Sequence, residues 1–549
     1  MTDRRKYWGW GLESEQSSPE ELASAAEGLR AHLGFGEEDI ELPVELDELE
    51  LPAPRIGIPP ELRDVGSASV YDRARYGLGR SYGDVVCGMR GQIAYPPDFV
   101  VHAWNEDHVQ RTLDWAGEHA VSVTPVGGGT SVVGGVEARV GGGQIGAISL
   151  ALGAMDRVLQ VDPVSRAARI QAGTTGPALE DQLSRAGLTL RFFPQSFELS
   201  TRGGWIATRA GGHFASGPTH IDDLVEGVRA LTPGAGPWQS RRLPGSGAGV
   251  SPDRMLLGSE GTLGVITEAW VRVLPKPKHR RSAGVRFATF AAGAAAVREV
   301  VQAGLMPANC RLIDEREAAF TFAGDGTHAL LVLGFEACSP SDAAPRAGHD
   351  PSPRDSAGDE LASSLLSRRM DLALSICARL GGVAEERDPT ERGSMGAWRD
   401  AFLRAPYLRD TFVAMGVLAE TFETAITWDR HDAFVDDVRG TAEAVLRERC
   451  GAGSVTVRLT HAYPDGAAPY FTCLAPVERG AELETWAAVK HAASEAILRC
   501  GGTITHHHAV GRDHRPWYDR QRPDPFATAL QAAKAAVDPA GILNPGVLF

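Results

Sequence analysis

The feature that most constrains this chain is a glycine-dense loop that follows a short β-branched stretch at Val121–Thr124. The loop has the sequence PVGGGTSVVGG and runs from Pro125 to Gly135. Three consecutive glycines carry no Cβ, so the backbone N–H groups of such a loop can closely approach a flat anionic ligand. A Rossmann loop would require a helix directly after the glycines and an acidic residue about 20 positions later. The chain instead continues into an apolar stretch and a second glycine triplet at 141–143, which favours a turn-built phosphate site for a dinucleotide.

Two further stretches rich in glycine and hydroxyl groups argue against the alternative for this loop, a flexible surface turn. Residues 194–212 have the sequence PQSFELSTRGGWIATRAGG, with Arg202 and Arg209 as positive charges, and residues 257–268 have the sequence LGSEGTLGVITE. A polar, glycine-spaced segment at Arg75–Asp84 is expected to be a loop and is a weaker candidate for ligand contact. The three main stretches together predict a long cofactor that is contacted along its length.

Length and charge limit the class of protein. The 549 residues exceed what one hydrophobic core usually supports, so two or three domains are expected. The 70 acidic and 55 basic residues give a net charge of −15, which argues against a nucleic-acid binder. Seven scattered cysteines without C-x-x-C spacing are typical of buried thiols in a reducing compartment. The first residues lack the apolar core of a signal peptide, and no apolar run approaches the length of a membrane span. We therefore expect a cytoplasmic protein.

The three glycine stretches in this order, with the closing DPAGILNPG at 538–546, resemble the FAD-binding flavoproteins of the vanillyl-alcohol oxidase type, whose fold is also called PCMH. Other motifs extend the resemblance over nearly the whole chain to one family, the alkyldihydroxyacetonephosphate synthases, also called alkylglycerone-phosphate synthases. These motifs are YWGWG at 7–11, RLIDE at 311–315, YLRD at 407–410, ETFETAITWDR at 420–430 and THHHAVG at 505–511.

The resemblance implies an α+β architecture in which a PCMH-type FAD-binding domain is followed by an α+β cap domain and a C-terminal segment that completes the active site. Alternating short strands and helices support an α+β domain that ends near two prolines at 275 and 277. Within the cap, a Ser/Pro/Ala/Asp-rich stretch at 338–359 is expected to be a disordered loop. The expected parts are an N-terminal arm and helical region at 1–91, the FAD-binding domain at 92–277, the cap at 278–500 and the C-terminal segment at 501–549.

The cofactor that the resemblance implies is FAD, bound non-covalently by the three glycine stretches. The residues expected to bind FAD are Pro125, Val126, Gly127, Gly128, Gly129, Thr130, Ser131, Gln195, Ser196, Phe197, Glu198, Leu199, Ser200, Thr201, Thr208, Arg209, Ala210, Gly211, Glu260, Gly261, Thr262, Leu263, Gly264, Val265 and Ile266.

The reaction that the resemblance implies is the replacement of the acyl chain of acyl-dihydroxyacetone phosphate by a long-chain fatty alcohol, which forms an ether-lipid precursor without net oxidation. The alternative is an FAD-dependent 2-hydroxy-acid or alcohol dehydrogenase or oxidase of the same fold. Lipid substrates suggest peripheral contact with a membrane. A homodimer is left open.

One arginine and one tyrosine match positions with roles in the family. The resemblance implies that Arg409 in YLRD binds substrate, and a guanidinium can hold a departing carboxylate bidentately. The plainer alternative for Arg409 is an ion pair, for example with Asp410. Tyr470 matches the catalytic tyrosine and would serve proton transfer at the carbon that bears the acyl group, whereas position alone favours a packing role. Arg311 is a further substrate-binding candidate, with an ion pair at the core edge as its alternative.

The triplet His506, His507 and His508 is the most unusual local feature, because three adjacent side chains cannot share one face of a strand or helix. Metal binding is the obvious alternative, but metal ligands are usually spaced and joined by carboxylates or cysteines, so no metal is expected. We expect a positively polarised pocket for the substrate phosphate, with one histidine sharing proton transfer. The family usually has glycine where Ala509 stands, and a methyl group there could reshape the turn if the position holds a positive φ.

Overall fold

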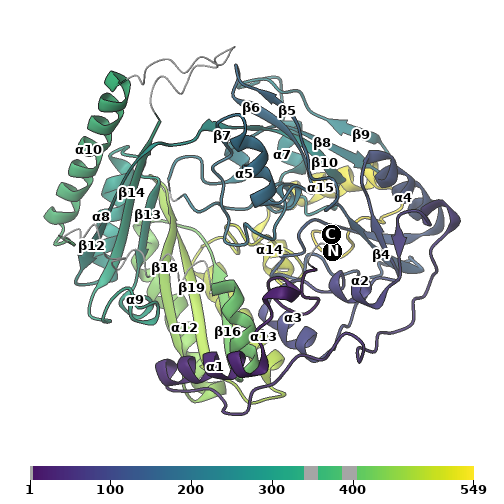
Figure 1. Ribbon diagram of the computed structural model, residues 1–549, viewed down its shortest axis with the longest axis horizontal. Helices are drawn as coiled ribbons and strands as arrows, with labels where there is room; N and C mark the ends of the chain where they lie inside the picture. Colours follow the sequence, from purple (N-terminus) through teal and green to yellow (C-terminus); the bar gives the residue numbers. More distant parts are fainter. Residues whose placement is uncertain (1–3, 215, 339–355, 386–404) are drawn as a thin grey trace.

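The chain builds two smaller sheets between residues 66 and 272 and one large sheet between residues 279 and 476. Figure 1 shows the computed structural model, which describes residues 4–214, 216–338, 356–385 and 405–549. The loop predicted to be disordered at 338–359 falls largely on 339–355, outside the described residues, and the chain is helical from Ser356. The two smaller sheets lie on the upper right of Figure 1 and the large sheet on the lower left.

The first small sheet has four strands in the order β1-β2-β4-β3, of which β2, β4 and β3 are parallel. The second has five antiparallel strands in the order β5-β6-β10-β8-β9, and β7 pairs separately with β11. Strand β4 is buried along its whole length, which explains its continuous run of apolar and small residues. The bounds are β1 (Gly66–Ser67), β2 (Val100–His102), β3 (Val121–Val126), β4 (Gly146–Ala151), β5 (Val158–Asp162), β6 (Ala167–Gln171), β7 (Leu188–Thr189), β8 (Val225–Thr232), β9 (Gly236–Gln239), β10 (Val265–Arg272) and β11 (Leu274–Pro275).

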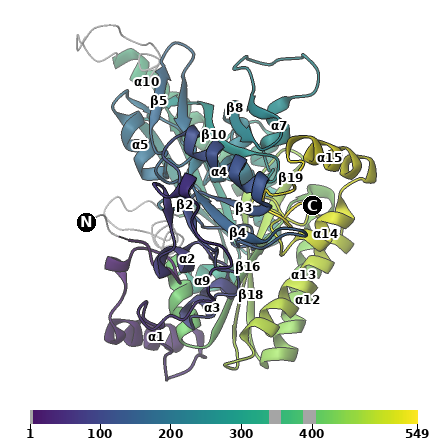
Figure 2. The ribbon, with the colours of Figure 1, turned by 90° about the vertical axis from the view of Figure 1, so that its right-hand side faces the viewer.

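The large sheet is antiparallel, in the order β15-β12-β14-β13-β18-β19-β16, with β17 paired to β19. Helices α8, α10, α12 and α13 pack against it, and α12 and α13 lie side by side in Figure 2. Strands β18 and β19 are buried on both faces. One face packs against helix α12, and the other lines a cavity. The bounds are β12 (His279–Phe287), β13 (Asn309–Ile313), β14 (Ala329–Ala337), β15 (Val383–Ala384), β16 (Val417–Glu423), β17 (Ile426–Thr427), β18 (Ser454–Ala462) and β19 (Gly466–Pro476).

The helices begin and end at local sequence signals. For example, α1 begins after Ser18, whose side chain accepts a hydrogen bond from Glu21 N, and ends at Gly34 with φ +78°. None of the described helices combines the length and apolar character that a membrane crossing needs. The bounds are α1 (Pro19–Leu33), α2 (Val70–Arg75), α3 (Tyr82–Met89), α4 (Glu106–His119), α5 (Gly176–Ser184), α6 (Arg202–Thr208), α7 (Pro252–Leu256), α8 (Phe290–Gln302), α9 (Glu315–Phe320), α10 (Ser356–Arg379), α12 (His431–Cys450), α13 (Glu482–Arg499), α14 (Arg515–Gln521) and α15 (Asp524–Val537), with residues 405–414 also helical.

The N-terminal region packs against the large sheet. The buried side chains of Tyr7, Trp8 and Trp10 belong to the same hydrophobic cluster as Val417 and Phe471 of that sheet. Helix α1 crosses the lower end of the large sheet in Figure 1, where His32 Nε2 lies 3.2 Å from the carbonyl oxygen of Phe320. The arm before α1 is therefore part of the packed structure.

The C-terminal segment returns to the first small sheet. Val123 in β3 donates its N–H to the carbonyl of Ile542 and accepts one from Asn544 N, so 542–544 extends the edge of this sheet next to the glycine loop. The Asn544 side chain donates to the carbonyls of Gly135 and Glu260. One asparagine thus joins two of the glycine stretches.

One expectation about local structure is wrong in part. Residues Arg75–Asp84 were expected to form a loop, but Arg75 ends α2 and α3 begins at Tyr82. The Ser81 side chain caps α3 by accepting from Asp84 N, a pattern that the abundant glycines of this segment obscure.

Candidate functional site

A cavity of about 860 Å³ lies between the smaller sheets and the large sheet. One wall contains the glycine loop after β3, the residues around α6 and the turn before β10. The opposite wall contains side chains of β13, β18, β19 and the helical segment 405–414. Its volume falls in the range of about 300–1,000 Å³ that is usual for ligand and cofactor sites. Segments far apart in the sequence therefore meet at one site.

The glycine loop packs too closely against its neighbours to carry side chains. A Cβ on Gly127 would lie 2.0 Å from Thr201 Oγ1, and one on Gly128 would lie 2.2 Å from the carbonyl oxygen of Leu199. Both contacts are shorter than real Cβ contacts. Only glycine therefore fits at these two positions while the loop packs against the second glycine stretch. Gly127, Gly128 and Gly129 line the cavity, and a phosphate site built from turns uses backbone of this kind.

Two buried donors beside this loop have no hydrogen-bond partner in the described structure. They are Arg75 Nη1 and Thr201 Oγ1, and Thr201 lines the cavity. The other end of the Arg75 guanidinium donates to the carbonyl of Gly128 at 2.6 Å. Buried donors of this kind usually have partners, so a polar, anionic cofactor such as FAD fits this wall.

Most of the residues expected to bind FAD line the cavity. Those that do are Pro125, Gly127, Gly128, Gly129, Thr130, Ser131, Gln195, Ser196, Ser200, Thr201, Thr208, Ala210, Gly211, Glu260, Gly261, Gly264 and Ile266. The others lie behind this wall or beside it: Val126, Phe197, Glu198, Leu199, Arg209, Thr262, Leu263 and Val265. Among these, Arg209 is half exposed and pairs with Asp222, with 2.8 Å between its Nη2 and Asp222 Oδ2. The positive charge of Arg209 is therefore paired with the buried carboxylate of Asp222.

The two expected substrate-binding arginines both line the opposite wall. Arg409 Nη1 donates to the carbonyl of Arg80 at 2.8 Å, and Arg409 makes no ion pair with Asp410, its neighbour in the sequence. Arg311 in β13 is 2% exposed, and its Nη2 donates to the carbonyl of His213 at 3.1 Å. Burial lowers the pKa of Arg311 to about 9, and the guanidinium stays charged near pH 7. Two fixed cations thus face the cavity.

Tyr470 lies in β19 with its ring held by charged and aromatic neighbours. The guanidinium of Arg458 lies 3.9 Å from the ring centroid, and the ring stacks on His507 with centroids 6.2 Å apart at 20°. Among the described residues the Tyr470 hydroxyl makes no hydrogen bond, and the residue lines the cavity. The hydroxyl is therefore available to a substrate in a fixed position.

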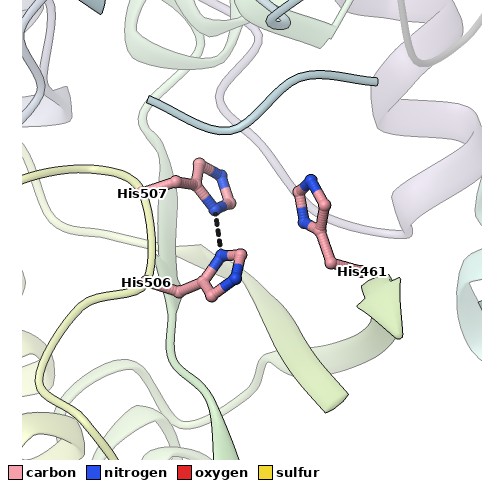
Figure 3. A group of neighbouring side chains, drawn as sticks. All are labelled: His461, His506 and His507. Atoms are coloured by element: carbon pink, nitrogen blue, oxygen red, sulfur yellow. Dashed lines mark hydrogen bonds between the residues drawn. The ribbon is translucent and has the colours of Figure 1, made fainter. Parts of the chain in front are cut away.

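The three histidines follow a tight turn and do not all face the same way. His507 and His508 line the main cavity, whereas His506 lies behind them and its Nε2 is 2.8 Å from the Tyr463 hydroxyl and 3.0 Å from His220 Nε2. Figure 3 shows the 3.0 Å hydrogen bond between the Nδ1 atoms of His506 and His507. A chain of hydrogen bonds therefore connects His507 to Tyr463.

These histidines are not the source of positive charge that the sequence suggested. Burial is the main reason that the pKa values of His506, His507 and His508 lie below the ordinary value. The rings are therefore mostly neutral near pH 7, and they act as hydrogen-bond partners that can pass a proton. The fixed cations of the cavity are the arginines on the opposite wall, and a phosphate pocket at the histidines stays a prediction.

A buried carboxylate shapes the histidine turn. The side chain of Glu423, at the end of β16, is fully buried and accepts backbone N–H groups of His506, His507 and His508 at 2.7–3.2 Å. It also accepts the hydroxyl of Thr505 at 2.6 Å. Burial alone would raise the pKa of Glu423, but the neighbouring histidines, which take up a proton before Glu423 does as the pH falls, and the Thr505 hydroxyl outweigh it and hold the pKa well below its ordinary value. This carboxylate is an anionic anchor for the turn.

The position after the triplet keeps a conformation that favours glycine. Ala509 has φ +77° and is 7% exposed, so the methyl group does not move the turn out of the left-handed region. The next two amides, of Val510 and Gly511, donate at 2.9 Å to the carboxylate of Glu260 in the third glycine stretch. The turn is therefore held from both walls, and the strain at Ala509 is imposed by these contacts.

A metal site deserves separate consideration, because His461, His506 and His507 offer ring nitrogens within 4.8 Å of one another, and the three rings appear together in Figure 3. His461 Nε2 lies 2.8 Å from the carbonyl oxygen of Gly212. A carbonyl oxygen cannot donate a hydrogen bond, so this nitrogen carries the proton and is not a free metal ligand. His506 Nε2 is already engaged by Tyr463. The absence of a metal stays a prediction.

Several side chains in or next to the cavity were not predicted from the sequence. Arg458 and His461 lie in β18 and face the cavity, but neither belongs to a recognisable local pattern. Glu423 was part of a motif without a role of its own. The only sequence signal for these residues was charge or histidine inside an otherwise apolar strand, which is unusual because charged side chains are rarely buried.

Two protein-family models match the chain. One is described as "FAD binding domain" and matches residues 97–238, and the other as "FAD linked oxidases, C-terminal domain" and matches residues 276–548. The first match includes the glycine loop, and the second includes the large sheet and the histidine turn. FAD is therefore the cofactor, as the sequence predicted.

Characterised relatives cover most of the chain. Alkyldihydroxyacetonephosphate synthase of Trypanosoma brucei brucei is 31% identical over 510 residues, which is 91% of this chain and 82% of the relative. The same enzyme of Caenorhabditis elegans is 30% identical over 495 residues, or 86% of this chain and 80% of the relative. Glycolate oxidase subunit GlcD of Bacillus subtilis is 26% identical over 460 residues, or 82% of this chain and 89% of the relative.

Solved structures confirm the fold class. A structure of alkyldihydroxyacetonephosphate synthase superposes with a TM-score of 0.78 at 23% identity, covering 99% of this chain and 100% of the other. The crystal structure of p-cresol methylhydroxylase with substrate bound gives a TM-score of 0.64 at 14% identity, covering 97% and 98%. The α+β, PCMH-type fold predicted from the sequence is thereby confirmed.

Proposed function

This chain belongs to the alkyldihydroxyacetonephosphate synthase family, and we propose that it replaces the acyl chain of an acyl-dihydroxyacetone phosphate with a long-chain fatty alcohol. In this reaction the bond between the substrate carbon and the acyl oxygen breaks, and the fatty acid leaves as a carboxylate. The alcohol oxygen then forms the ether bond to the same carbon and loses its proton. No net oxidation takes place.

The observation that carries the proposal is the combination of an arginine wall, a positioned tyrosine and an apolar end in one cavity. The apolar end is contributed by α1, the chain around α9 and the helical segment 405–414. Such a surface suits alkyl chains, whereas a small hydroxy acid would leave it exposed to water. The apolar residues are Ala25, Leu29, Phe320, Phe322, Pro406, Leu408 and Phe412.

The side chains of this wall suit the steps of the reaction. Arg409 and Arg311 would bind the carboxylate and phosphate groups, since a guanidinium keeps its charge and offers paired donors. Tyr470 would take and return the proton on the carbon that bears the acyl group, and the neutral histidines beside it would relay protons. When bound, FAD supplies a flavin ring that can accept electron density from the substrate, and we propose that it is held non-covalently.

The test is product analysis by mass spectrometry after flavin-loaded protein is incubated with palmitoyl-dihydroxyacetone phosphate and hexadecanol. The visible flavin spectrum is followed in the same sample. Ether product with released palmitate is expected, without accumulation of reduced flavin. The alternative is an FAD-dependent 2-hydroxy-acid or alcohol dehydrogenase, which the similarity to GlcD keeps open. No ether product, with a flavin that loses its visible absorbance only when hydroxy acids are added, would replace the proposal by that alternative.

Location and assembly are further parts of the proposal. A cytoplasmic protein that contacts membranes peripherally would reach lipid substrates, and the apolar cavity end next to the half-exposed residues of α1 supports this. Flotation with phospholipid vesicles should move most of the protein to the vesicle fraction; equal recovery in both fractions would contradict it. A homodimer is proposed as well, and sedimentation velocity at several concentrations distinguishes it from a monomer.

A further inference from the structure

The YWGWG arm at the N-terminal end forms a closed loop. Arg5 and Leu12 pair as an antiparallel bridge, and Lys6 N donates to the carbonyl of Gly11 at 3.1 Å. The three aromatic side chains of the arm are each at most 5% exposed. The arm is therefore a compact element, seated firmly on the body of the protein.

This loop surrounds one carboxylate. Lys6 Nζ lies 3.2 Å from Asp410 Oδ2, and Trp10 N donates to both oxygens of Asp410 at 3.2 Å. A Cβ on Gly9 would lie 2.5 Å from Asp410 Oδ2, so only glycine fits between the two tryptophans. The Lys6 and Asp410 side chains are 10% and 8% exposed, and burial is the main reason that the pKa of Asp410 is raised. Such a pair holds its geometry because separating it would leave a buried charge unpaired.

A second connection runs from the arm to Arg409 through Arg80. Arg80 is 3% exposed and donates its Nη2 to the carbonyl of Lys6 at 2.9 Å. The carbonyl of Arg80 accepts the Nη1 donor of Arg409 at 2.8 Å. Since Asp410 directly follows Arg409, the contacts form a closed ring from Lys6 through Asp410, Arg409 and Arg80 back to Lys6. The arm thus contacts Asp410 directly and reaches the guanidinium of Arg409 through Arg80.

The arm also reaches the cofactor wall. Arg5 Nη1 donates to the carbonyl of Gly128 at 2.7 Å, beside the Arg75 donor to the same oxygen. Arg80, which contacts the arm at Lys6, donates its N–H to the carbonyl of Ser131 in the same loop at 2.6 Å. One short segment therefore contacts both the glycine loop and the residue next to the substrate arginine.

We propose that the arm from Arg5 to Gly11 is a positioning element of the active site, in which Lys6 holds Arg409 in place through Asp410. The inference rests on the proposed carboxylate-binding role of Arg409. It assigns no direct contact between Lys6 and substrate. What Lys6 contributes is the orientation of a guanidinium that must meet a carboxylate at two points.

The test compares Lys6→Met, Lys6→Arg and Arg4→Gln in flavin-loaded protein. Arg4 is the matched control, because it directly precedes the arm, is half exposed and pairs with Glu13 rather than with Asp410. Calorimetric titration with dodecanoate reports carboxylate binding without turnover, and the visible spectrum reports FAD content. Lys6→Met should bind dodecanoate about tenfold more weakly with FAD retained, and its kcat/KM should fall about a hundredfold. Lys6→Arg should recover most of both, and Arg4→Gln should match the unaltered protein.

A double-mutant cycle with Arg409→Lys separates positioning from general destabilisation. If Lys6 acts through Arg409, adding Lys6→Met to Arg409→Lys should weaken dodecanoate binding no further. An equal loss in both backgrounds, or unchanged binding by folded Lys6→Met, would overturn the inference. Should Lys6→Met alone fail to fold, the pair Lys6→Met with Asp410→Asn removes both charges and is judged by the same titration. If the unaltered protein makes no ether product but dodecanoate binding still depends on Lys6, the proposed function fails and the positioning role stands.

Discussion

The guanidinium of Arg458 lies 3.9 Å from the centroid of the Tyr470 ring, within the range of a cation–π contact. Arg458 Nη1 in turn donates to Glu317 Oε1 at 2.9 Å, in a buried ion pair. Both charged residues are among those that line the cavity. Glu317 holds the Arg458 guanidinium in place, and the guanidinium in turn holds the Tyr470 ring. The Tyr470 hydroxyl is therefore presented to a substrate in one orientation.

Tyr470→Phe should retain FAD and lose ether formation by about 10²–10⁴-fold, because only the hydroxyl that exchanges a proton is removed. Product formation and the flavin to protein ratio are measured on the same sample. Tyr95→Phe is the control, since Tyr95 is 40% exposed and does not line the cavity. Near-normal turnover of Tyr470→Phe, or release of its flavin, would remove the catalytic role.

Glu423→Gln should destabilise the folded protein by about 2–4 kcal/mol, because an amide replaces a carboxylate that accepts three backbone amides and a hydroxyl. The pKa of Glu423 is lowered by folding, so its stabilising effect is present above the unfolded value of 4.5 and is lost as the pH falls below it. Denaturant unfolding above and below that pH measures both effects. Unfolding free energies for Glu423→Gln that equal those of the parent at neutral pH would contradict the anchoring role.

Ala509→Gly should raise the unfolding free energy by about 0.5–1 kcal/mol, because a non-glycine residue at φ +77° is strained. Thermal unfolding of the flavin-loaded protein measures the change. Ala529→Gly in α15 is the control with the opposite sign, since glycine within an exposed helix costs about 1 kcal/mol. A lower melting temperature for Ala509→Gly would show that this turn carries no strain.

His514 should make stability depend on pH. Burial is the main reason that its pKa falls from 6.5 to about 4 in the folded protein. Between these values the unfolded chain binds a proton that the folded chain does not, so stability falls as the pH falls, by about 1.4 kcal/mol per pH unit. His514→Asn keeps a donor for the carbonyl of Ala509, which His514 Nδ1 contacts at 2.9 Å, and should flatten this slope. Above pH 6.5 the dependence of stability on pH should be the same for the parent and for His514→Asn. Equal slopes for the two proteins between pH 4 and 6.5 would refute the pKa shift.

Chelation should leave activity unchanged. The protein is treated with excess EDTA, passed through a desalting column and assayed, and its metal content is measured by plasma mass spectrometry. Because the ring nitrogens of His461 and His506 are engaged by a carbonyl and a tyrosine, no stoichiometric zinc is expected. A metal that is present at one per chain and is lost together with activity would establish the site at His461, His506 and His507 instead.

Local signals in the sequence predicted the fold class and much of the cavity wall. The glycine stretches could be recognised because glycine is required wherever two backbones approach closely, as for Gly127 and Thr201. Helix α1 could be placed from Ser18, Pro19 and Gly34, whose cap geometry is local. Helix α6 could not, because Gly203 and Gly204 have low helix propensity and the helix is held by tertiary packing of its apolar face.

The charged part of the site was less accessible to sequence analysis. Arg209 was expected at the cofactor, yet its charge is paired with Asp222, 13 residues later. Glu423 and Arg458 occupy ordinary strand positions, and their roles appear only when β16, β18 and the histidine turn are assembled. Lys6 and Asp410 are separated by 404 positions, and no pattern within a window of the sequence connects such residues.

The Lys6–Asp410 pair also has a consequence for how the protein is prepared. Bringing together two residues so far apart in the sequence costs only slightly more entropy than closing a short loop, because the cost of loop closure grows with the logarithm of loop length. Because the contact joins residues 404 positions apart, we expect it to form late in folding. If the arm positions Arg409 as proposed, we expect a molecule whose arm has not yet packed to bind flavin without an oriented Arg409. The yellow colour of a preparation therefore counts the molecules that have bound FAD, and active-site titration is needed to count those that can turn over.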